Sequence, residues 1–240
     1  MALVLLQARM RSTRLPGKVL LPLGGLRAID WPLRRLAEVG PVVLCTSDAA
    51  ADDGLAGSIR GPVTRGSEND VLGRFLGALE EHAAGEVIVR ATGDNPLVLP
   101  ELAAEAIDQL QRDGADYCSI EGSALGTTVE VLTREALVRV GAVAESAEER
   151  EHPTLGILRR PERFRITRCQ APAHYRSDLR LTLDTPADYA YLAALVQAIA
   201  KPPEAVTWRD ICAHAQPRAE AAKQHLLDEV QRLKEHAWQP

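Results

Sequence analysis

The chain has 240 residues, of which 46% are hydrophobic and 25% are charged, and its formal net charge is -5. This composition predicts a globular protein with a core of ordinary size, built as one large domain or as one domain with a substantial insertion. The acidic balance argues against a nucleic-acid-binding track, which needs a broad basic face.

The sequence also argues against a membrane protein, a secreted protein and a zinc or disulfide scaffold. The longest uncharged helical run, 189–200, is shorter than the roughly 20 residues that a membrane span needs. The apolar start, 1–6, has neither a basic segment before it nor a cleavage site after it, so we expect a strand there and a cytoplasmic protein. Because no Cys-x-x-Cys pair occurs, we expect small buried side chains at Cys45, Cys118, Cys169 and Cys212.

Short apolar or β-branched runs alternate along the chain with helical patterns. Strands are expected at 3–6, 42–45, near 63, 87–89, near 116–118 and at 180–183. Helices are expected from about Asp30, from about Asp52, over 68–83 with Ser67 as N-cap, over 100–112, and from Pro186 with Thr185 as N-cap and Asp188 in the first turn. The alternation predicts an α/β fold in which a mostly parallel sheet has helices on both faces and binds ligands at the carboxyl ends of its strands.

The loop that follows the first strand, 7–18, concentrates basic side chains, which are Arg9, Arg11, Arg14 and Lys18. Guanidinium groups bind phosphate oxygens in bidentate fashion and a lysine adds a mobile charge, so this loop predicts a polyphosphate site. It is not a Walker A loop, since Ser12 and Val19 stand where Gly and Ser or Thr are required, and 23–26 does not form a Gly-x-Gly-x-x-Gly turn. Taken alone, a solvated basic loop is an equally good interpretation.

Two aspartates stand at the ends of expected strands. Asp94 lies in the turn 93–96 after the strand at 87–89, and Asp184 follows the strand at 180–183. Two carboxylates opposite a basic loop fit a site for Mg2+ and a nucleotide, because Mg2+ prefers hard oxygen ligands. Each aspartate also has a simpler interpretation, as a residue that caps a turn or the following helix.

Six motifs in sequence order resemble the cytidylyltransferase family. The nearest branch is the spore coat polysaccharide biosynthesis group, and the CMP-Kdo and CMP-sialic acid synthetases are more distant. The motifs are 7–18, 65–72, 90–96, 129–131, 151–154 and 183–188. Each would be weak alone, but together they extend the resemblance from Gln7 to about Leu195.

The resemblance implies a Rossmann-like nucleotide-binding domain of the nucleotide-diphospho-sugar transferase type over 1–200. It also implies a small protruding acceptor and dimerisation segment at about 120–178, while 201–240 would be a C-terminal helical extension with Trp208 and Trp238 as packing anchors. The implied activity is Mg2+-dependent transfer of CMP from CTP to a small acidic sugar, with release of pyrophosphate, for surface polysaccharide or glycan biosynthesis. The implied protein is a homodimer with no nucleic-acid or membrane partner.

Site residues follow from the matching positions and from their placement at strand ends. The expected catalytic residues are Lys18, Arg9 and Asp94, and the expected metal ligands are Asp94 and Asp184. The expected nucleotide-binding residues are Gln7, Ala8, Arg9, Arg14, Lys18, Thr46, Ser47, Arg65, Gly66, Ser67 and Asp94. The expected acceptor-binding residues are Arg90, Asn95, Glu130 and His152.

Two departures from the family pattern and one histidine leave alternatives open. Arg11 stands where a small residue is usual, and its side chain either adds a phosphate contact or partly blocks the loop. Thr128 replaces the Asp of a Gly-x-Asp-Val-Glu pattern, so the acceptor stays undetermined. His152 is either an acceptor contact or proton-transfer partner, or a half-exposed residue that ends a helix. The alternative functions are nucleotidyl transfer to a phosphonate or a sugar phosphate, and nucleotide binding without catalysis.

Overall fold

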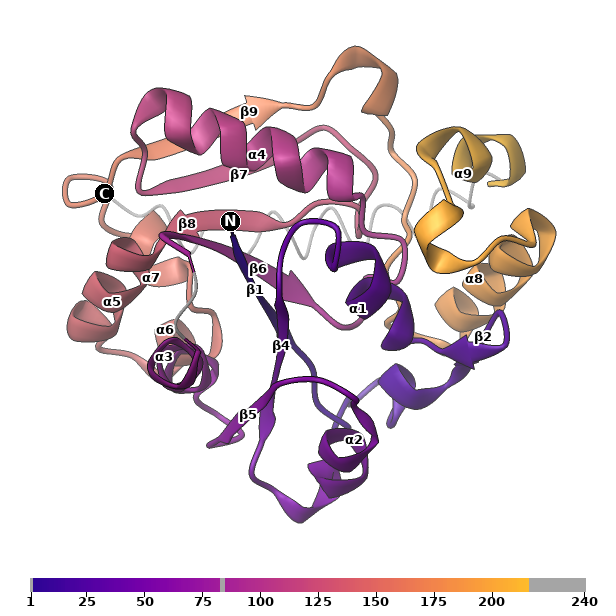
Figure 1. Ribbon diagram of the computed structural model, residues 1–240, viewed down its shortest axis with the longest axis horizontal. Helices are drawn as coiled ribbons and strands as arrows, with labels where there is room; N and C mark the ends of the chain where they lie inside the picture. Colours follow the sequence, from indigo (N-terminus) through magenta and orange to yellow (C-terminus); the bar gives the residue numbers. More distant parts are fainter. Residues whose placement is uncertain (1, 83–84, 216–240) are drawn as a thin grey trace.

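The computed structural model describes residues 2–82 and 85–215, and its main feature is a seven-stranded sheet in the order β5-β4-β1-β6-β8-β7-β9 (Figure 1). Strand β8 runs antiparallel to β6 and β7, and the other neighbouring strands are parallel. The strands are β1 (Leu3–Gln7), β4 (Val42–Ser47), β5 (Val63–Gly66), β6 (Val87–Thr92), β7 (Tyr117–Glu121), β8 (Glu130–Thr133) and β9 (Ile166–Gln170), and β2 (Pro22–Leu23) pairs with β3 (Leu26–Arg27) in a separate hairpin. The predicted α/β fold with a mostly parallel sheet is confirmed.

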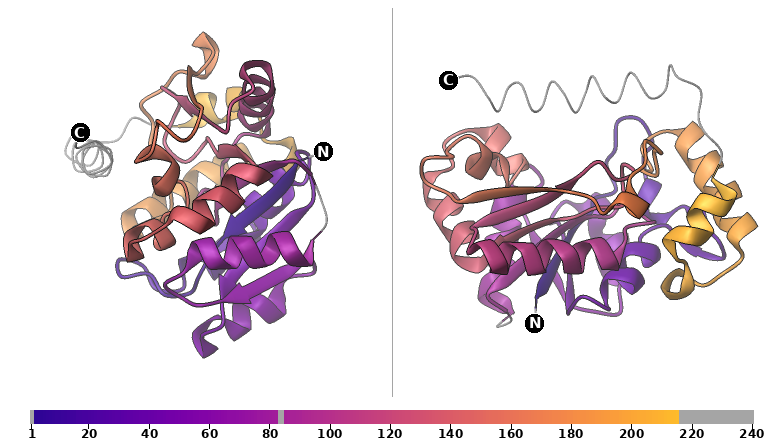
Figure 2. Two further views of the ribbon diagram at one scale, coloured as in Figure 1. Left: turned by 90° about the vertical axis from the view of Figure 1, so that its left-hand side faces the viewer. Right: turned by 90° about the horizontal axis from the view of Figure 1, so that it is seen from above.

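Helices cover both faces of the sheet (Figure 2). The α-helices are α1 (Asp30–Leu36), α2 (Asp53–Ser58), α3 (Val71–Glu81), α4 (Pro100–Asp113), α5 (Arg134–Val143), α6 (Ala147–Glu151), α7 (Leu155–Leu158), α8 (Pro186–Ile199) and α9 (Trp208–His214). The 3-10 turns are η1 (Lys18–Leu20), η2 (Ala50–Asp52), η3 (Ala173–Tyr175) and η4 (Pro203–Ala205). None of the helices in the described ranges is both long enough and apolar enough to cross a membrane.

The central strand β1 explains why two helical layers are needed. Val4 and Leu6 pack with α1, α4 and α8 on one face, and Leu3 and Leu5 pack with α3, α5 and α7 on the other. Because successive side chains of a strand point to opposite faces, a strand that is apolar at every position requires cover on both sides. This burial fixes β1 at the centre, where its carboxyl end opens into the basic loop.

Helix α3 begins later than the sequence predicts. We expected a helix over 68–83 with Ser67 as N-cap, but α3 begins at Val71 and its N-cap is Asp70, whose side chain accepts a bond from the amide of Gly73. The Arg74 guanidinium, in the first turn of α3, donates to the carbonyls of Ser67 and Glu68 and so holds them outside the helix.

The strand expected at 180–183 is also wrong. These residues form an extended segment with a single bridge, between Arg180 and Leu125. The amide of Leu181 donates to the carbonyl of Leu125, and the amide of Leu183 donates to the carbonyl of Asp94, at 2.8 Å in each case. Two separate loops therefore take the place of a neighbouring strand, and they set the position of Asp184.

Other boundaries differ by smaller amounts. Strand β6 continues to Thr92, three residues beyond the expected end, and β7 covers 117–121 where 116–118 was expected. The expected burial of the cysteines is correct for Cys45 and Cys118, but Cys169 is half-buried and Cys212 is exposed. Cys169 lies on the edge strand β9, and Cys212 lies on the outer face of the terminal helix α9.

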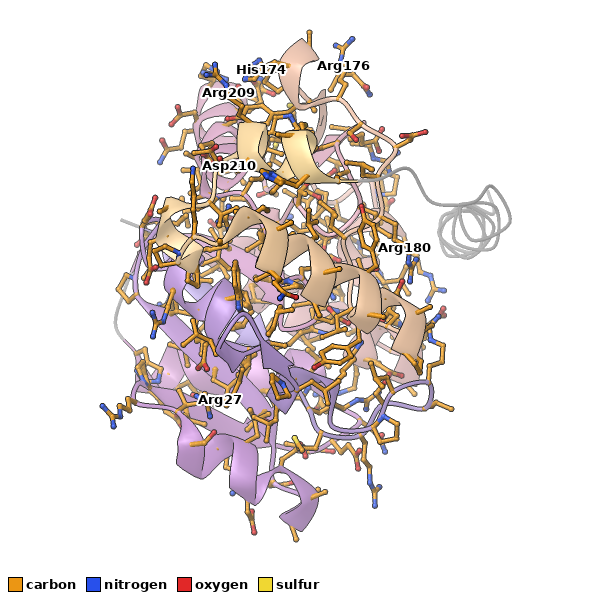
Figure 3. The ribbon with its side chains drawn as sticks, turned by 90° about the vertical axis from the view of Figure 1, so that its right-hand side faces the viewer. Arg27, His174, Arg176, Arg180, Arg209 and Asp210 are labelled. Atoms are coloured by element: carbon orange, nitrogen blue, oxygen red, sulfur yellow. The ribbon has the colours of Figure 1, made fainter. Side chains whose placement is uncertain are left out.

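The C-terminal part packs through Trp208, as expected. Its side chain is buried, and its indole nitrogen donates to the carbonyl of His174 at 2.6 Å. Figure 3 shows His174 and Arg209 together where α9 meets the η3 turn. Trp238 lies outside the described residues.

Residues 120–178 supply β8 and β9 to the sheet and α5, α6 and α7 to one face, and the η3 turn stands out beyond β9 (Figure 1).

We expect Gly126→Ala to destabilise the protein. Gly126 has a φ of +90°, and a Cβ there would lie 2.9 Å from the backbone of Leu181 and Thr182. The substitution should lower the free energy of unfolding by about 1–3 kcal/mol, measured by urea denaturation. Gly54→Ala is the matched control, because Gly54 is helical with open space at its Cβ position, and it should be neutral or stabilising. Equal effects of the two substitutions would contradict this account.

Candidate functional site

A cavity of about 370 Å³ opens at the carboxyl ends of β1 and β6. Its size is that of an ordinary small-molecule site. Eight of the predicted site residues lie in its wall, namely Gln7, Ala8, Arg9, Arg14, Lys18, Asp94, His152 and Asp184. The wall also contains Arg11, Ser12, Thr13, Val19, Val71, Arg74, Thr92, Gly93 and Glu151.

The side chain of Lys18 joins the two predicted metal ligands. Its Nζ atom donates to Asp94 Oδ2 at 2.7 Å and to Asp184 Oδ1 at 2.8 Å. Burial alone would lower the pKa of Lys18, but the two carboxylates outweigh burial and raise it. The lysine is therefore positively charged and lies between two carboxylates that are 90 residues apart in the chain.

Asp184 lies among further cations. Arg180 Nη2 donates to Asp184 Oδ2 at 2.8 Å, and Arg14 Nη2 lies 3.5 Å from Asp184 Oδ1. Burial would raise the pKa of the Asp184 carboxyl, but Lys18, Arg14 and Arg180 together hold the pKa below its usual range. Figure 3 shows Arg180 on the side of the molecule that α8 covers. The carboxylate is thus charged and oriented before any ligand arrives.

The simpler role of an N-terminal cap belongs to Asp188. Thr185 and Asp188 form a capping box at the start of α8, in which the Asp188 carboxylate accepts from the amides of Asp184 and Thr185. Asp188 also pairs with Arg180 at 3.3 Å. Because Asp188 caps the helix, the Asp184 side chain is left to face the cavity.

Asp52 fixes the backbone of the basic loop through a hydrogen bond. Asp52 Oδ1 accepts from the amide of Met10 at 2.6 Å, and Asp52 Oδ2 accepts from the amide and the hydroxyl of Ser47. The amide of Gly17 closes the loop by donating to the carbonyl of Met10 at 2.8 Å. These bonds bring Arg9, Arg14 and Lys18 to one cavity wall.

The Gly93-Asp94 turn packs tightly against the loop. The amide of Gly93 donates to the carbonyl of Gln7 at 2.8 Å. A Cβ on Gly93 would lie 2.8 Å from the Ala8 side chain and 2.7 Å from that of Ile29. Glycine is therefore required for the close approach that places Asp94 beside Lys18.

Two charged cavity residues, Arg74 and Glu151, were not among the predicted site residues, although Glu151 belongs to the family motif at 151–154. Arg74 is buried on α3, and its Nε atom has no hydrogen-bond partner within the ranges that the structure describes. Glu151 pairs with Arg9 at 3.2 Å. A buried arginine inside a helical pattern has no local signal that separates it from a solvated one, so Arg74 becomes recognisable only when α3 is docked.

The unusual Arg11 does not block the cavity. It is mostly exposed, and its guanidinium pairs with Glu68 at 3.1 Å, at the turn before α3. The cavity wall then has five basic side chains, Arg9, Arg11, Arg14, Lys18 and Arg74, against the three acids Asp94, Glu151 and Asp184. A surplus of positive charge in an acidic protein favours a compact polyanion as ligand.

Glu130 lies at the centre of a polar cluster behind the cavity. It accepts from Arg90, from the Tyr117 hydroxyl at 2.5 Å and from the Thr154 hydroxyl at 3.0 Å. Arg90 in turn donates from Nε and Nη2 to Gln7 Oε1 at 3.2 Å, which directs the amide nitrogen of Gln7 away from the guanidinium. Arg90 and Glu130 therefore support Gln7 and are not themselves in the cavity wall.

The cluster also places His152. This residue caps the C-terminal end of α6, is half-buried and lines the cavity, while Thr154 two positions later holds Glu130. The structure thus shows the helix-ending role, and the acceptor contact or proton transfer stays a prediction for a residue that lines the cavity.

Five residues predicted to bind the nucleotide are not in the cavity wall, namely Thr46, Ser47, Arg65, Gly66 and Ser67. Thr46 and Ser47 are fully buried, and Ser47 binds Asp52. Arg65 donates to the carbonyl of Ser47 at 2.9 Å and pairs with Asp53 at 2.7 Å. Gly66 lies beside the Arg74 side chain, and the carbonyl of Ser67 accepts from Arg74. Asn95 Oδ1 is buried and has no hydrogen-bond partner among the described residues.

The donor set fits a hard divalent ion. Asp94 and Asp184 already converge on one cation, the ammonium of Lys18. Over the described ranges, no group of three or more His, Cys, Asp or Glu side chains is arranged to hold a metal. Two carboxylates suffice for Mg2+, which commonly takes its other ligands from substrate phosphates and water.

A family model and several known proteins are similar to this chain. The cytidylyltransferase family model matches residues 3–209. The spore coat polysaccharide biosynthesis protein SpsF of Bacillus subtilis is 38% identical over 214 residues, which cover 84% of this chain and 89% of SpsF. A cytidylyltransferase structure from Leptospira borgpetersenii has a TM-score of 0.77 at 26% identity, covering 97% of this chain and 95% of that one. The structure of CMP:2-keto-3-deoxy-manno-octonic acid synthetase complexed with CTP has a TM-score of 0.62 at 17% identity and shares the fold, covering 82% of this chain and 98% of that one.

We expect Glu130→Gln to reduce the pH dependence of stability. Burial would raise the pKa of the Glu130 carboxyl, but Arg90 and the bonds from Tyr117 and Thr154 lower it. A lowered folded-state pKa gives stability that is complete above the unfolded-state pKa of about 4.3 and is lost as the pH falls through the folded-state value.

Urea denaturation at about pH 7 and about pH 3.5 measures this effect. At the higher pH the Glu130→Gln protein should be less stable than wild type by about 1–3 kcal/mol, and at the lower pH the difference should shrink. A difference that is the same at both pH values would contradict the assignment.

Proposed function

Because this chain belongs to the cytidylyltransferase family, we propose that it transfers CMP from CTP to a small acidic sugar and releases pyrophosphate. Mg2+ is the proposed cofactor, and the product would serve surface polysaccharide or glycan biosynthesis. The observation that carries the proposal is the convergence of Lys18, Asp94 and Asp184 in a cavity that Arg9 and Arg14 also line.

The geometry supports nucleotidyl transfer because such a reaction depends mainly on positioning and charge neutralisation. In this proposal Arg9, Arg14 and Lys18, which line the cavity, would bind the CTP phosphates, and Asp94 and Asp184 would hold the metal. When bound, the metal would neutralise phosphate charge and make the attacking hydroxyl more acidic.

The proposed reaction is an in-line substitution at the α-phosphorus. The acceptor hydroxyl oxygen forms a bond to that phosphorus, the bond to the bridging oxygen breaks, and pyrophosphate leaves with the electron pair. The proton of the hydroxyl passes to His152, which lines the cavity, or to water. Gln7, held by Arg90, presents a hydrogen-bond donor to the bound substrates.

The choice of CTP rests on the family and on the CTP-bound structure of the synthetase that shares the fold. The proposed acceptor side comprises His152 and the cluster around Glu130, with Arg90 and Asn95 behind the wall. The remaining proposed nucleotide-binding residues lie outside the cavity wall and would act indirectly, through the contacts of Asp52 with the basic loop and of Arg74 with Ser67. They are Thr46, Ser47, Arg65, Gly66 and Ser67. A cytoplasmic homodimer that pairs through 120–178 completes the proposal, with 1–200 as the catalytic domain and 201–240 as an extension.

Thermal unfolding with CTP, UTP, ATP and GTP, each with and without Mg2+, tests this function. A ligand at about 100 times its Kd stabilises the native state by about 2.7 kcal/mol, so CTP with Mg2+ should raise the Tm by about 5–10 °C. A rise with a different nucleotide would overturn the choice of CTP, and no rise with any of them would contradict the nucleotide site.

Asp94→Asn is the control variant, because it keeps the size of the side chain and removes a metal ligand. It should fold and lose the Mg2+-dependent part of the Tm rise. It should also lose pyrophosphate release in a screen of sugar acids, phosphonates and sugar phosphates, which separates the leading function from its alternatives. Selective CTP binding with no release from any acceptor would support a nucleotide-binding protein without catalysis.

A further inference from the structure

We propose that Lys18 occupies the cation position of the nucleotide-free protein, so that the metal enters only together with the triphosphate. The proposal rests on the proposed function and adds a role to Lys18 beyond contact with phosphate. It makes Lys18 the residue by which the site selects a metal–nucleotide complex over free metal ion.

The first argument is the identity of the oxygen atoms. Lys18 binds Asp94 Oδ2 and Asp184 Oδ1, at 2.7 and 2.8 Å, and these are the atoms by which the two carboxylates converge. A divalent ion held between Asp94 and Asp184 would compete with the ammonium for the position where the two carboxylates converge. Because the ammonium and a divalent ion repel each other at such short range, we expect the two cations to exclude each other there.

The second argument is charge. In the nucleotide-free site, Asp184 contacts the three cations Lys18, Arg14 and Arg180. Asp94 also contacts Lys18 and Asp188 also contacts Arg180, so three carboxylates already match three cations. A divalent ion that entered alone would add two positive charges to a cluster whose charges are already matched. In a half-buried site such an excess is costly, because solvent screens it less than on the surface.

The triphosphate removes both obstacles. It brings several negative charges to the wall formed by Arg9 and Arg14, and it offers the Lys18 ammonium new oxygen partners. The lysine stem is flexible and its charge is compact, so the ammonium can exchange carboxylates for phosphates while its backbone stays in the η1 turn. Departure of pyrophosphate would return Lys18 to Asp94 and Asp184 and favour release of the metal with the product.

Metal binding to the nucleotide-free protein tests this directly. Mn2+ binding is followed by electron paramagnetic resonance in wild type, Lys18→Gln and the double variant Lys18→Gln, Asp94→Asn. Lys18→Gln should bind Mn2+ at least about tenfold more tightly than wild type, because it removes the competing cation. The double variant should return to weak binding. Equal affinity of wild type and Lys18→Gln would overturn the proposal.

Arg14→Gln is the matched control. It also removes one positive charge near Asp184, but Arg14 Nη2 lies 3.5 Å from Asp184 Oδ1. Lys18 Nζ lies 2.8 Å from the same atom and binds Asp94 as well. Its effect on Mn2+ affinity should therefore stay well below that of Lys18→Gln. An equal gain in both variants would show that net charge alone controls metal affinity and would overturn the exchange.

A measurement on wild type keeps the proposal testable if Lys18→Gln does not fold. The chain has four lysines, so the Nζ and Cε resonances of lysine-labelled protein are few. The Lys18 signal should be unchanged by Mg2+ alone and should shift with Mg2+ and inorganic triphosphate. A shift with Mg2+ alone would overturn the proposal, as would the absence of a shift when triphosphate is bound.

Inorganic triphosphate separates this inference from the proposed function. It has no base, so it moves Lys18 whether or not the protein selects CTP. If the triphosphate moves Lys18 while CTP gives no selective stabilisation, the exchange stands and the proposed substrate is wrong. If CTP with Mg2+ binds selectively while Mn2+ affinity is the same in wild type and Lys18→Gln, the proposed function stands and the exchange is wrong.

Discussion

The ammonium of Lys18 between Asp94 and Asp184 is the interaction on which the site depends. The two carboxylates belong to segments that meet through a single backbone bond, from the amide of Leu183 to the carbonyl of Asp94. Without a cation between them, two partly buried carboxylates at this distance would repel each other. Lys18 therefore supplies charge compensation and also fixes the distance between the ends of two separate segments.

The sheet explains how one lysine can reach both partners. Parallel pairing of β1 with β6 places Gln7 opposite Thr92, so the basic loop and the Gly93-Asp94 turn leave the sheet at the same edge. The antiparallel strand β8 then brings Glu130 beside Arg90, which connects the same edge to the turn at Thr154. The pairing of these strands thus brings the basic loop and His152 to the same cavity.

Local sequence signals predict the parts of this structure that local physics controls. The alternation of apolar runs and helical patterns predicts the sheet and its two helical layers, because strands covered on both faces must be apolar at every position. Thr185, Pro186 and Asp188 predict the start of α8 correctly, since a capping box involves only neighbouring residues. The basic loop and Asp94 are also recognisable, because each follows the end of a buried strand, β1 or β6, that can be read from the sequence. Asp184 lies in the cavity wall as predicted, although the strand expected before it does not form.

The errors arise where contacts of the folded chain prevail over the local pattern. Ser67 is a good N-cap in isolation, but Arg74, seven residues along, draws its carbonyl away from the helix. The segment at 180–183 alternates like a strand, yet its amides bond to Leu125 and Asp94, which only the folded chain brings near. Arg74 carries no local mark of function, and Glu151 is marked only as part of a family motif. Both become cavity residues when α3 and α6 pack beside the basic loop.

The most direct test of the central claim is a crystal structure with Mn2+ and a CTP analogue whose α,β-bridge cannot be cleaved. The account predicts an anomalous Mn2+ peak bound by Asp94 and Asp184, the phosphates against Arg9 and Arg14, and Lys18 moved from the carboxylates to the phosphates. A nucleotide bound elsewhere, or a metal peak away from both aspartates, would contradict the account.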